Sequence, residues 1–379
     1  MDSRFFSWAR LWAVMVKEFV QMRRDRLTFA MMVGIPILQL ILFGYAINAD
    51  PKALPTAVLS ADNSIFSRTF VRALENSGYF RVVRRIASES EANEALAIGE
   101  VQFVVTLPED FSRKLARGER PALLLEADAS DPAATSNALA ALLTLNQTAL
   151  ARDLQGSLAH LQNQPPPFEV RVHRRYNPEG ITQYNIVPGL IGTILTMTMV
   201  MMTALAMTRE RERGTMENLL AMPVRPIEVM AGKIVPYIVV GYVQVAVILL
   251  VAKLLFGVPM VGSLALLSLA LIVFIAANLA VGFTFSTLAK NQLQAMQMAF
   301  FFFLPSILLS GFMFPFRGMP QWAQWLGEAL PLTHFLRILR GILLKGNVAA
   351  EILTDLWPVA LFLLVAAAIA LLRYRETLD

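Results

Sequence analysis

The chain has 379 residues, of which 56% are hydrophobic and only 16% are charged, and its formal net charge is +5. Soluble globular domains carry about 25% charged residues, so this apolar excess predicts that much of the chain lies in a membrane. The absence of cysteine excludes disulfide frameworks, iron–sulfur clusters and cysteine nucleophiles. The three histidines do not have the spacing of zinc ligands.

The first 26 residues predict an amphipathic helix that lies along the cytoplasmic membrane surface. Phe5, Trp8 and Trp12 recur at helical spacing, whereas Arg10 falls on another face. An uncharged apolar run follows at 27–49, and about 20 residues suffice to cross a bilayer. A cleaved signal peptide is an alternative, but its charged region would be unusually long and its cleavage pattern poor. We therefore predict an uncleaved first transmembrane helix.

Residues 50–186 have the composition of a soluble protein and predict a separate extracytoplasmic α/β domain. Alternating patterns indicate strands at 56–59, 81–86, 101–107, 122–126 and 169–173, and helices at 64–76, 88–98, 108–116 and 131–161. Ser88 followed by Glu91 predicts a capping box, and Gly78, Gly99 and Gly118 stand where helices should stop.

The charged residues of this domain do not indicate chemistry. Basic and acidic residues are dispersed and nearly balanced, so we expect no nucleic-acid partner. The closest acidic pair, Glu109 and Asp110, opens a predicted helix, where carboxylates favour the helix dipole over acid–base catalysis. No residue of the domain is assigned a catalytic role.

Five further apolar runs in residues 187–379 complete a predicted fold of six transmembrane helices. They lie at 187–208, 234–252, 262–289, 296–314 and 356–372. Lysine and arginine concentrate before the first run, after the second run and at the end of the chain. This distribution places both termini in the cytoplasm and the 50–186 domain on the outside of a multi-pass membrane protein. Arg317, Arg337, Arg340 and Lys345 weaken the pattern, because their segment is expected outside.

The apolar runs contain no ionisable residue, which argues against ion-coupled transport. Asn278 is their notable polar residue, and we predict that it hydrogen-bonds to another helix. A phosphate-binding loop is also absent, because Gly232-Lys233 is followed by Ile234 rather than by serine or threonine. If ATP drives transport, the hydrolysing domain must belong to another chain.

The loop at 209–233 is the candidate surface for contact with such a chain. It begins with alternating charges from Arg209, passes through Gly214 and enters a short amphipathic stretch that Pro223 stops. A helix there would present Met216 and Leu219 as apolar knobs among charged neighbours. From composition alone, an ordinary solvated loop with cytoplasmic arginines explains the segment equally well.

This loop resembles the signature loop of ABC transporter type-2 permeases. The resemblance rests on Glu-Arg-Gly-Thr-Met-Glu-Asn-Leu-Leu and Met-Pro-Val-Arg-Pro-Ile-Glu-Val-Met-Ala-Gly-Lys, both within 210–233. Pro331-Leu332-Thr333 leading to Arg340-Gly341, the surface helix and the inserted domain are also similar to that family. The resemblance implies a half-transporter that dimerises and pairs with two ATPase subunits, which hold ATP and Mg²⁺. It implies that this chain binds no cofactor or metal and is not itself an enzyme.

The resemblance also assigns two sets of site residues. The first would form the coupling helix that docks into the ATP-binding subunit: Arg213, Gly214, Thr215, Met216, Glu217, Leu219 and Arg225. The second belongs to short re-entrant helices expected on the outer side at 311–346: Phe312, Pro315, Trp322, Trp325 and Arg340.

With this resemblance, the sequence predicts the permease subunit of an ATP-driven exporter in a bacterial inner membrane, with the 50–186 domain in the periplasm. Its second permease subunit would be identical or related, and drugs, lipids and other amphiphiles are candidate substrates. Membrane lipid and a periplasmic adaptor protein are further candidate partners. The alternative is a membrane-anchored signalling or envelope-organising protein that binds a partner through its outside domain without transport. A secondary carrier is a third hypothesis and would show ion-driven flux without ATP.

Overall fold

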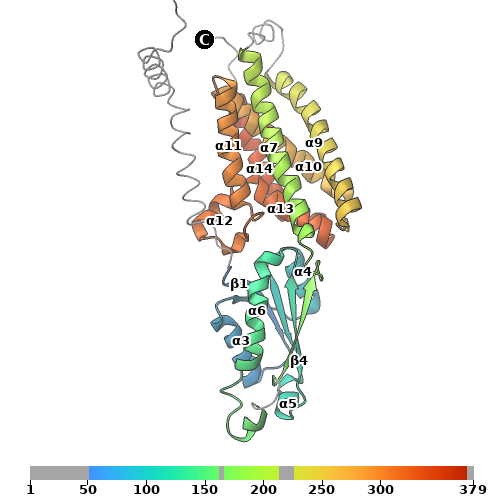
Figure 1. Ribbon diagram of the computed structural model, residues 1–379, viewed down its shortest axis with the longest axis vertical. Coiled ribbons are helices and arrows are strands. Elements are labelled where there is room, and N and C mark those ends of the chain that lie inside the picture. The colour runs from blue at the N-terminus through green and yellow to red at the C-terminus, as the bar shows by residue number, and fades with distance from the viewer. Residues whose placement is uncertain (1–50, 162–165, 213–225, 374–379) are drawn as a thin grey trace, which may run out of the picture.

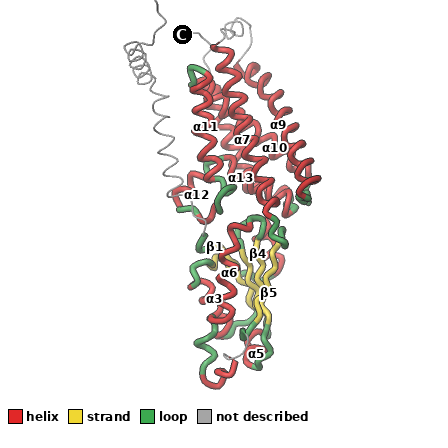
Figure 2. Tube along the Cα trace, viewed as in Figure 1, coloured by secondary structure: helices red, strands yellow, loops and turns green. Residues whose placement is uncertain are grey.

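The computed structural model describes residues 51–161, 166–212 and 226–373. These residues form an α/β domain that lies end to end with a bundle of long helices (Figures 1 and 2). The predicted surface helix at 1–26, the predicted first span at 27–49 and residues 213–225 of the predicted coupling loop lie outside the described residues.

The α/β domain is built on a five-stranded sheet with the order β2-β1-β3-β4-β5. β1 pairs in parallel with β2 and β3, β4 pairs in parallel with β5, and β3 and β4 are antiparallel. The strands are β1 (Leu54–Ser60), β2 (Phe80–Arg85), β3 (Phe103–Leu107), β4 (Ala122–Asp128) and β5 (Glu169–Arg175). The predicted combination of a helical membrane-type fold with an α/β sheet domain is confirmed.

Helices cover both faces of this sheet. They are α3 (Ile65–Asn76), α4 (Glu89–Ala97), α5 (Phe111–Ala116) and α6 (Pro132–Thr148). α3, α5 and α6 share one apolar core that includes Phe70, Phe111 and Phe168. α4 packs on the other face, where Leu96 joins Ala57 and Val104 in a second core. The domain therefore buries apolar residues on both sides of the sheet.

The predicted helix ends in this domain follow the expected local chemistry. Ser88 Oγ accepts the backbone N–H of Glu91 at 3.3 Å, and Glu91 Oε2 accepts the N–H of Ala87 at 3.3 Å. Gly78, Gly99 and Gly118 adopt φ values of 76°, 74° and 73°. This left-handed conformation ends a helix at little cost only when the residue is glycine.

The prediction of one helix from 131 to 161 was wrong. α6 ends at Thr148, and a 3₁₀ helix (Gly156–Leu161) follows a series of turns. Leu150, Leu154 and Leu161 are nevertheless buried in the same core as α6. Beyond Thr148 the chain folds back onto that core, so apolar residues still recur in the sequence. Periodicity alone therefore could not reveal the end of the helix.

Five helices of the described part of the chain are long and apolar enough to cross a membrane. They are α7 (Thr182–Glu212), α9 (Pro226–Phe256), α10 (Leu264–Leu288), α11 (Gln292–Leu309) and α14 (Ala349–Arg373). α10 lies centrally and packs against all four of the others. α14 begins at Ala349 rather than at 356, so Glu351 and Asp355 belong to a candidate span. The run predicted at 356–372 contains no ionisable residue, but the helix starts earlier and carries these two carboxylates in its first two turns.

The predicted interhelical hydrogen bond of Asn278 was also wrong. Its Nδ2 donates to Phe274 O of the same helix at 2.9 Å, and its Oδ1 has no partner within the described ranges. In a helix, the carbonyl four residues earlier lies within reach of a short polar side chain such as that of asparagine. The side chains packed around this part of α10 are mainly apolar and offer few competing acceptors.

Substitution of Gly282 tests how closely α7 and α10 approach. A Cβ added at Gly282 would overlap the backbone oxygen of Val200, which cannot move without shifting α7. At Gly241 the added Cβ would instead lie 2.7 Å from Cδ1 of Ile275, the far end of a flexible side chain. We expect Gly282→Ala to destabilise the chain by about 1–3 kcal/mol.

The matched control Gly241→Ala should cost clearly less in the same unfolding measurement on the purified chain. Equal losses for both variants would contradict the close backbone contact.

Candidate functional site at the junction of the two domains

The segment between α11 and α14, residues 311–346, forms short helices and is called the hairpin segment below. It contains a 3₁₀ turn (Phe316–Gly318), α12 (Gln321–Glu328), α13 (Pro331–Arg340) and a π-helical turn (Gly341–Lys345). Gly311 and Gly346 bound it with φ values of 80° and 74°. α13 is amphipathic and packs against α7, α10 and α14.

The predicted residues of the hairpin segment do not converge on one site. Phe312 packs against Gly189 of α7, and Pro315 is buried. Trp322 and Trp325 lie on the exposed face of α12, with 37% and 69% of their surface accessible. Arg340 alone reaches the junction with the α/β domain. The seven predicted coupling-helix residues, Arg213, Gly214, Thr215, Met216, Glu217, Leu219 and Arg225, lie outside the described part of the chain.

A buried ion pair joins the two domains. Lys345 Nζ lies 2.6 Å from Asp128 Oδ2, and the two side chains are only 8% and 9% exposed. The same ammonium group donates to Leu96 O at 3.0 Å and lies 5.1 Å from the centre of the Tyr176 ring. Burial, with the nearby charge of Asp128 as the next cause, raises the pKa of Tyr176 to about 12. Lys345 is thus satisfied mainly by groups of the α/β domain.

Two further donors from the helical bundle reach the carboxyl end of α4. Asn347 Nδ2 donates to Ala97 O at 3.1 Å, and Arg317 donates to Gly99 O at 2.9 Å. The last carbonyls of a helix lack partners within the helix and carry its partial negative charge. Lys345 and Asn347 therefore cap α4 from the other domain, and Arg317 binds the turn just after it, which fixes the α/β domain on the hairpin segment.

Arg340 lies between the same two domains. It donates to Gly311 O at 3.0 Å, and its Nη1 lies 3.9 Å from Asp131 Oδ2. Burial raises the pKa of Asp131, while the charge of Arg340 acts in the opposite direction. Arg340 thus helps to hold both the start of the hairpin segment and the loop after β4 in place.

A second polar network ties the hairpin segment to α14. His334 Nδ1 lies 2.8 Å from Asp355 Oδ1, and its Nε2 lies 2.9 Å from Glu328 O. Arg337 pairs with Glu328 at 2.5 Å and with Asp355 at 3.3 Å. Burial opposes the charge of Arg337, but its bonds to Glu328 and the charge of Asp355 outweigh this effect and raise its pKa.

These contacts explain the basic residues that weakened the topology pattern. Arg337, Arg340 and Lys345 all lie near carboxylates, and Arg317 binds a backbone carbonyl of the other domain. Sequence reasoning did not identify Asp128, His334 or Asp355 as functional residues. The signal in the sequence was the unexpected group of basic residues in a segment predicted to lie outside. It did not reveal their acidic partners, and the partner of Lys345 lies more than 200 residues away in the chain.

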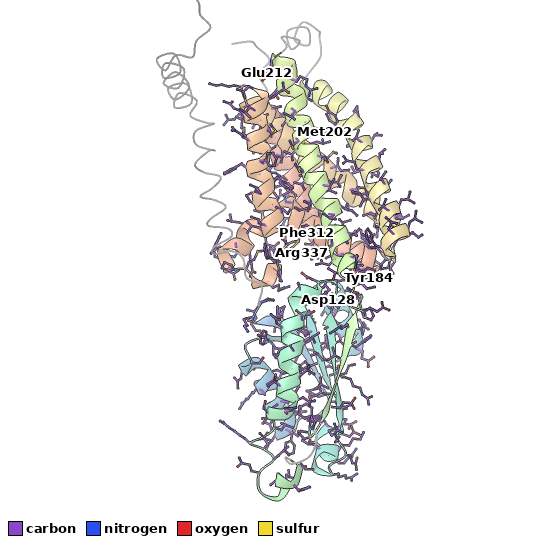
Figure 3. The ribbon with its side chains drawn as sticks, viewed as in Figure 1. Asp128, Tyr184, Met202, Glu212, Phe312 and Arg337 are labelled. Atoms are coloured by element: carbon purple, nitrogen blue, oxygen red, sulfur yellow. The ribbon has the colours of Figure 1, made fainter. Side chains whose placement is uncertain are left out.

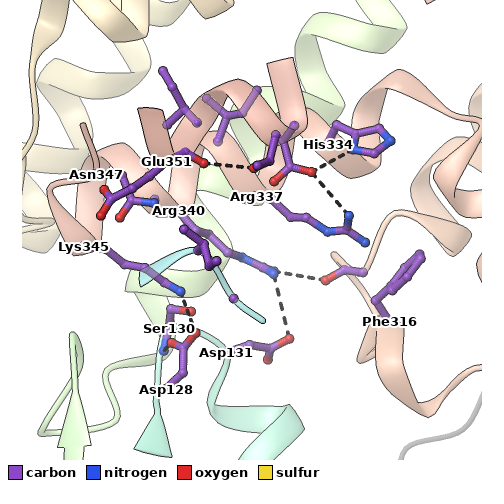
Figure 4. A pocket seen from close by; sticks show the side chains of 18 of the residues that line it. Asp128, Ser130, Asp131, Phe316, His334, Arg337, Arg340, Lys345, Asn347 and Glu351 are labelled. Atoms are coloured by element: carbon purple, nitrogen blue, oxygen red, sulfur yellow. Dashed lines mark hydrogen bonds and ion pairs between the residues drawn. The ribbon is translucent and has the colours of Figure 1, made fainter. Parts of the chain in front are cut away.

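The junction contains a partly open cavity of about 540 Å³ that both domains line (Figure 4). Three polar atoms of lining residues, Gln102 Oε1, Arg340 Nε and Asn347 Oδ1, have no hydrogen-bond partner in the described ranges. No group of three metal-ligating side chains is found among the described residues. The arrangement is suited to binding a polar group rather than to nucleophilic chemistry.

Comparison with known proteins identifies the family. Residues 26–372 match the family described as ABC-2 family transporter protein. The chain belongs to this family. It is 30% identical to the Probable multidrug ABC transporter permease YbhS of Escherichia coli strain K12, over all of both chains. It is 29% identical to YbhR of the same strain, over 97% of this chain and 98% of that protein.

The Inner membrane transport permease YhhJ of Escherichia coli strain K12 is 28% identical, over 90% of this chain and 93% of that protein. Membership in the ABC-2 family makes this chain a membrane permease component and implies an ATP-binding subunit as its partner. The apolar helices of this ABC-2 protein agree with a multi-pass membrane protein.

Proposed function

We propose that this chain is the membrane-spanning subunit of an ATP-driven exporter and forms the translocation pathway with a second permease subunit. A separate ATP-binding subunit would dock on residues 209–233. This proposal rests on the position of the loop at 209–233, whose sequence resembles the coupling helix of the family. α7 ends at Glu212 and α9 begins at Pro226, so the loop connects two candidate spans directly.

The contacts of α7 offer a route for the motion of that loop. Glu212, the last residue of α7, accepts the backbone N–H of Gln292 at 2.8 Å and so links α7 to α11. Figure 3 shows Glu212 and Arg337 toward opposite ends of the bundle. At the Arg337 end, α7 packs against α13, which also carries Arg340. A displacement of α7 would therefore reach the hairpin segment and the α/β domain as a rigid-body shift.

We further propose that the substrates are amphiphilic compounds exported across the inner membrane. YbhS and YbhR are named as probable multidrug permeases, and both match this chain over almost its whole length. The α/β domain would lie in the periplasm, and both termini would lie in the cytoplasm. In this arrangement the domain could contact substrate or a periplasmic adaptor protein after export.

Charge substitutions in the loop test the proposed docking. Glu217→Arg reverses the charge of a proposed acidic contact with the ATP-binding subunit. Leu219→Arg places a cation where an apolar side chain is proposed to meet that subunit. We expect each variant to lose co-purification with that subunit and to reduce the stimulated ATPase activity several-fold, because a desolvated unpaired charge opposes docking.

Leu143→Arg is the matched control, because Leu143 lies on α6 of the α/β domain and is 68% exposed. This control should leave association and stimulation unchanged. Wild-type association and ATPase stimulation in both loop variants would refute the docking site.

A further inference from the structure

The lining of the junction cavity carries charges of both signs in almost equal number. Arginine and lysine contribute Arg317, Arg337, Arg340 and Lys345, and the carboxylates are Asp128, Asp131, Glu328, Glu351 and Asp355. A lining of this kind favours a ligand that itself carries both signs. We propose that the cavity binds the headgroup of a phospholipid with a phosphate and a primary ammonium group, and that the acyl chains lie along α14.

One end of the cavity suits the phosphate. Arg317 is not within 4 Å of any carboxylate of the described residues, and its guanidinium contacts the carbonyl of Gly99. Loss of hydration, followed by the nearby charges of Arg337 and Arg81, lowers the pKa of Arg317. The guanidinium of Arg317 is therefore repelled by the charges of Arg337 and Arg81, with Glu328 as a partial counter-charge. A phosphate oxygen would relieve this repulsion and accept charge-assisted hydrogen bonds.

The other end of the cavity suits the ammonium group. Figure 4 shows Asn347 and Glu351 on one side, and Arg337 and Phe316 on the opposite side. Asn347 is only 8% exposed, and its Oδ1 lacks a donor within the described residues. Gln102 Oε1 also lacks a donor there. A primary ammonium group supplies three N–H donors for such acceptors, whereas a trimethylated one supplies none.

An apolar face begins at the edge of the cavity. Trp357 of α14 lines the cavity and is 58% exposed. Leu361 and Leu364, one and two turns further from the cavity, are also more than half exposed and share its helical face by their spacing. Tryptophan prefers the headgroup depth of a bilayer, with aliphatic residues deeper in the acyl region. The lipid would thus place its headgroup in the cavity and its chains against this face.

The cavity has the size of an ordinary small-molecule site, since such sites have volumes of roughly 300–1,000 Å³. The inference goes beyond the proposed function, because it concerns lipid binding by the chain alone and does not require that the lipid be exported. A binding measurement without ATP or partner subunits therefore separates its failure from a failure of the export proposal.

The test is native mass spectrometry of the full chain in detergent, titrated with phospholipids that share dioleoyl chains. We expect the phosphatidylethanolamine to bind about tenfold more tightly than the phosphatidylcholine or phosphatidylglycerol, because hydrogen bonds to charged groups carry the difference. Equal binding of the three lipids would overturn the proposal. Free phosphoethanolamine binding as tightly as the lipid would overturn the role of the acyl chains.

Variants at the two ends of the cavity sharpen this test. Arg317→Gln should weaken binding of the phosphatidylethanolamine about tenfold. Arg117→Gln, at an exposed site on the α/β domain next to α5, should leave binding unchanged. Equal losses in these two variants would overturn the phosphate assignment.

Glu351→Gln keeps an acceptor for the N–H of Val348 but removes the negative charge. It should abolish the preference for phosphatidylethanolamine over phosphatidylglycerol while leaving the Arg317 contact intact. Retention of the full preference in this variant would overturn the ammonium assignment, even if Arg317→Gln proved poorly folded.

Discussion

Lys345→Met is expected to lower the free energy of unfolding by about 3–5 kcal/mol, because it leaves the carboxylate of Asp128 buried without its cation. The two side chains are 8% and 9% exposed, so the carboxylate is largely removed from water and depends on the lysine for its stabilisation. The variant also removes the donor to Leu96 O at the end of α4. The measurement is equilibrium unfolding of the purified chain in mixed detergent micelles.

Two further variants separate this ion pair from a general effect of losing a lysine. Asp128→Asn combined with Lys345→Met removes both charges and should recover much of the loss, because no unpaired buried charge remains. Lys114→Met breaks a surface pair with Asp110 and should change stability little, since exposed pairs are screened by water. A double variant no more stable than Lys345→Met alone would contradict the buried-charge explanation.

Phe335→Ala is expected to destabilise the helical bundle by about 3–5 kcal/mol, the usual cost of removing a buried phenyl ring. Phe335 of α13 stacks on Phe274 of α10, with ring centroids 3.8 Å apart and planes 5° apart. Both rings are fully buried. In a bilayer, close packing rather than exclusion of water holds helices together, so the resulting void loses contacts that lipid cannot restore.

Phe301→Ala provides the matched control for the stacked pair. Phe301 lies on α11 and is 43% exposed, so hydrocarbon chains would replace part of the contacts that its ring makes. The free energy of unfolding should be highest for the wild type, lower for Phe301→Ala and lowest for Phe335→Ala. The reverse order of the two variants would show that α13 is not anchored through this stack.

Much of the fold was predictable because its signals are local. The strand and helix pattern of 50–186 follows from apolar periodicity, and glycines such as Gly99 mark helix ends through their left-handed conformation. Long apolar runs such as 262–289 indicate spans because the bilayer demands a minimum length. The error at 131–161 arose where a local pattern continued although the backbone turned.

The junction was not predictable from the sequence because its contacts are distant in the chain. Lys345 and Asp128 are separated by 217 residues, and Asn347 and Ala97 by 250. Each of these residues looks ordinary in its own segment. The early start of α14 was missed because Glu351 and Asp355 lower the local hydropathy, although Val348 and His334 provide the contacts that allow them there.

The central claim is that this chain moves solute only with energy received from a separate ATP-binding subunit. The most direct measurement is uptake of a fluorescent lipophilic cation into proteoliposomes that contain the chain alone or the chain with that subunit and ATP. The account predicts transport only in the complete, ATP-supplied complex. Transport by the chain alone, or no transport by a complex that hydrolyses ATP, would contradict it.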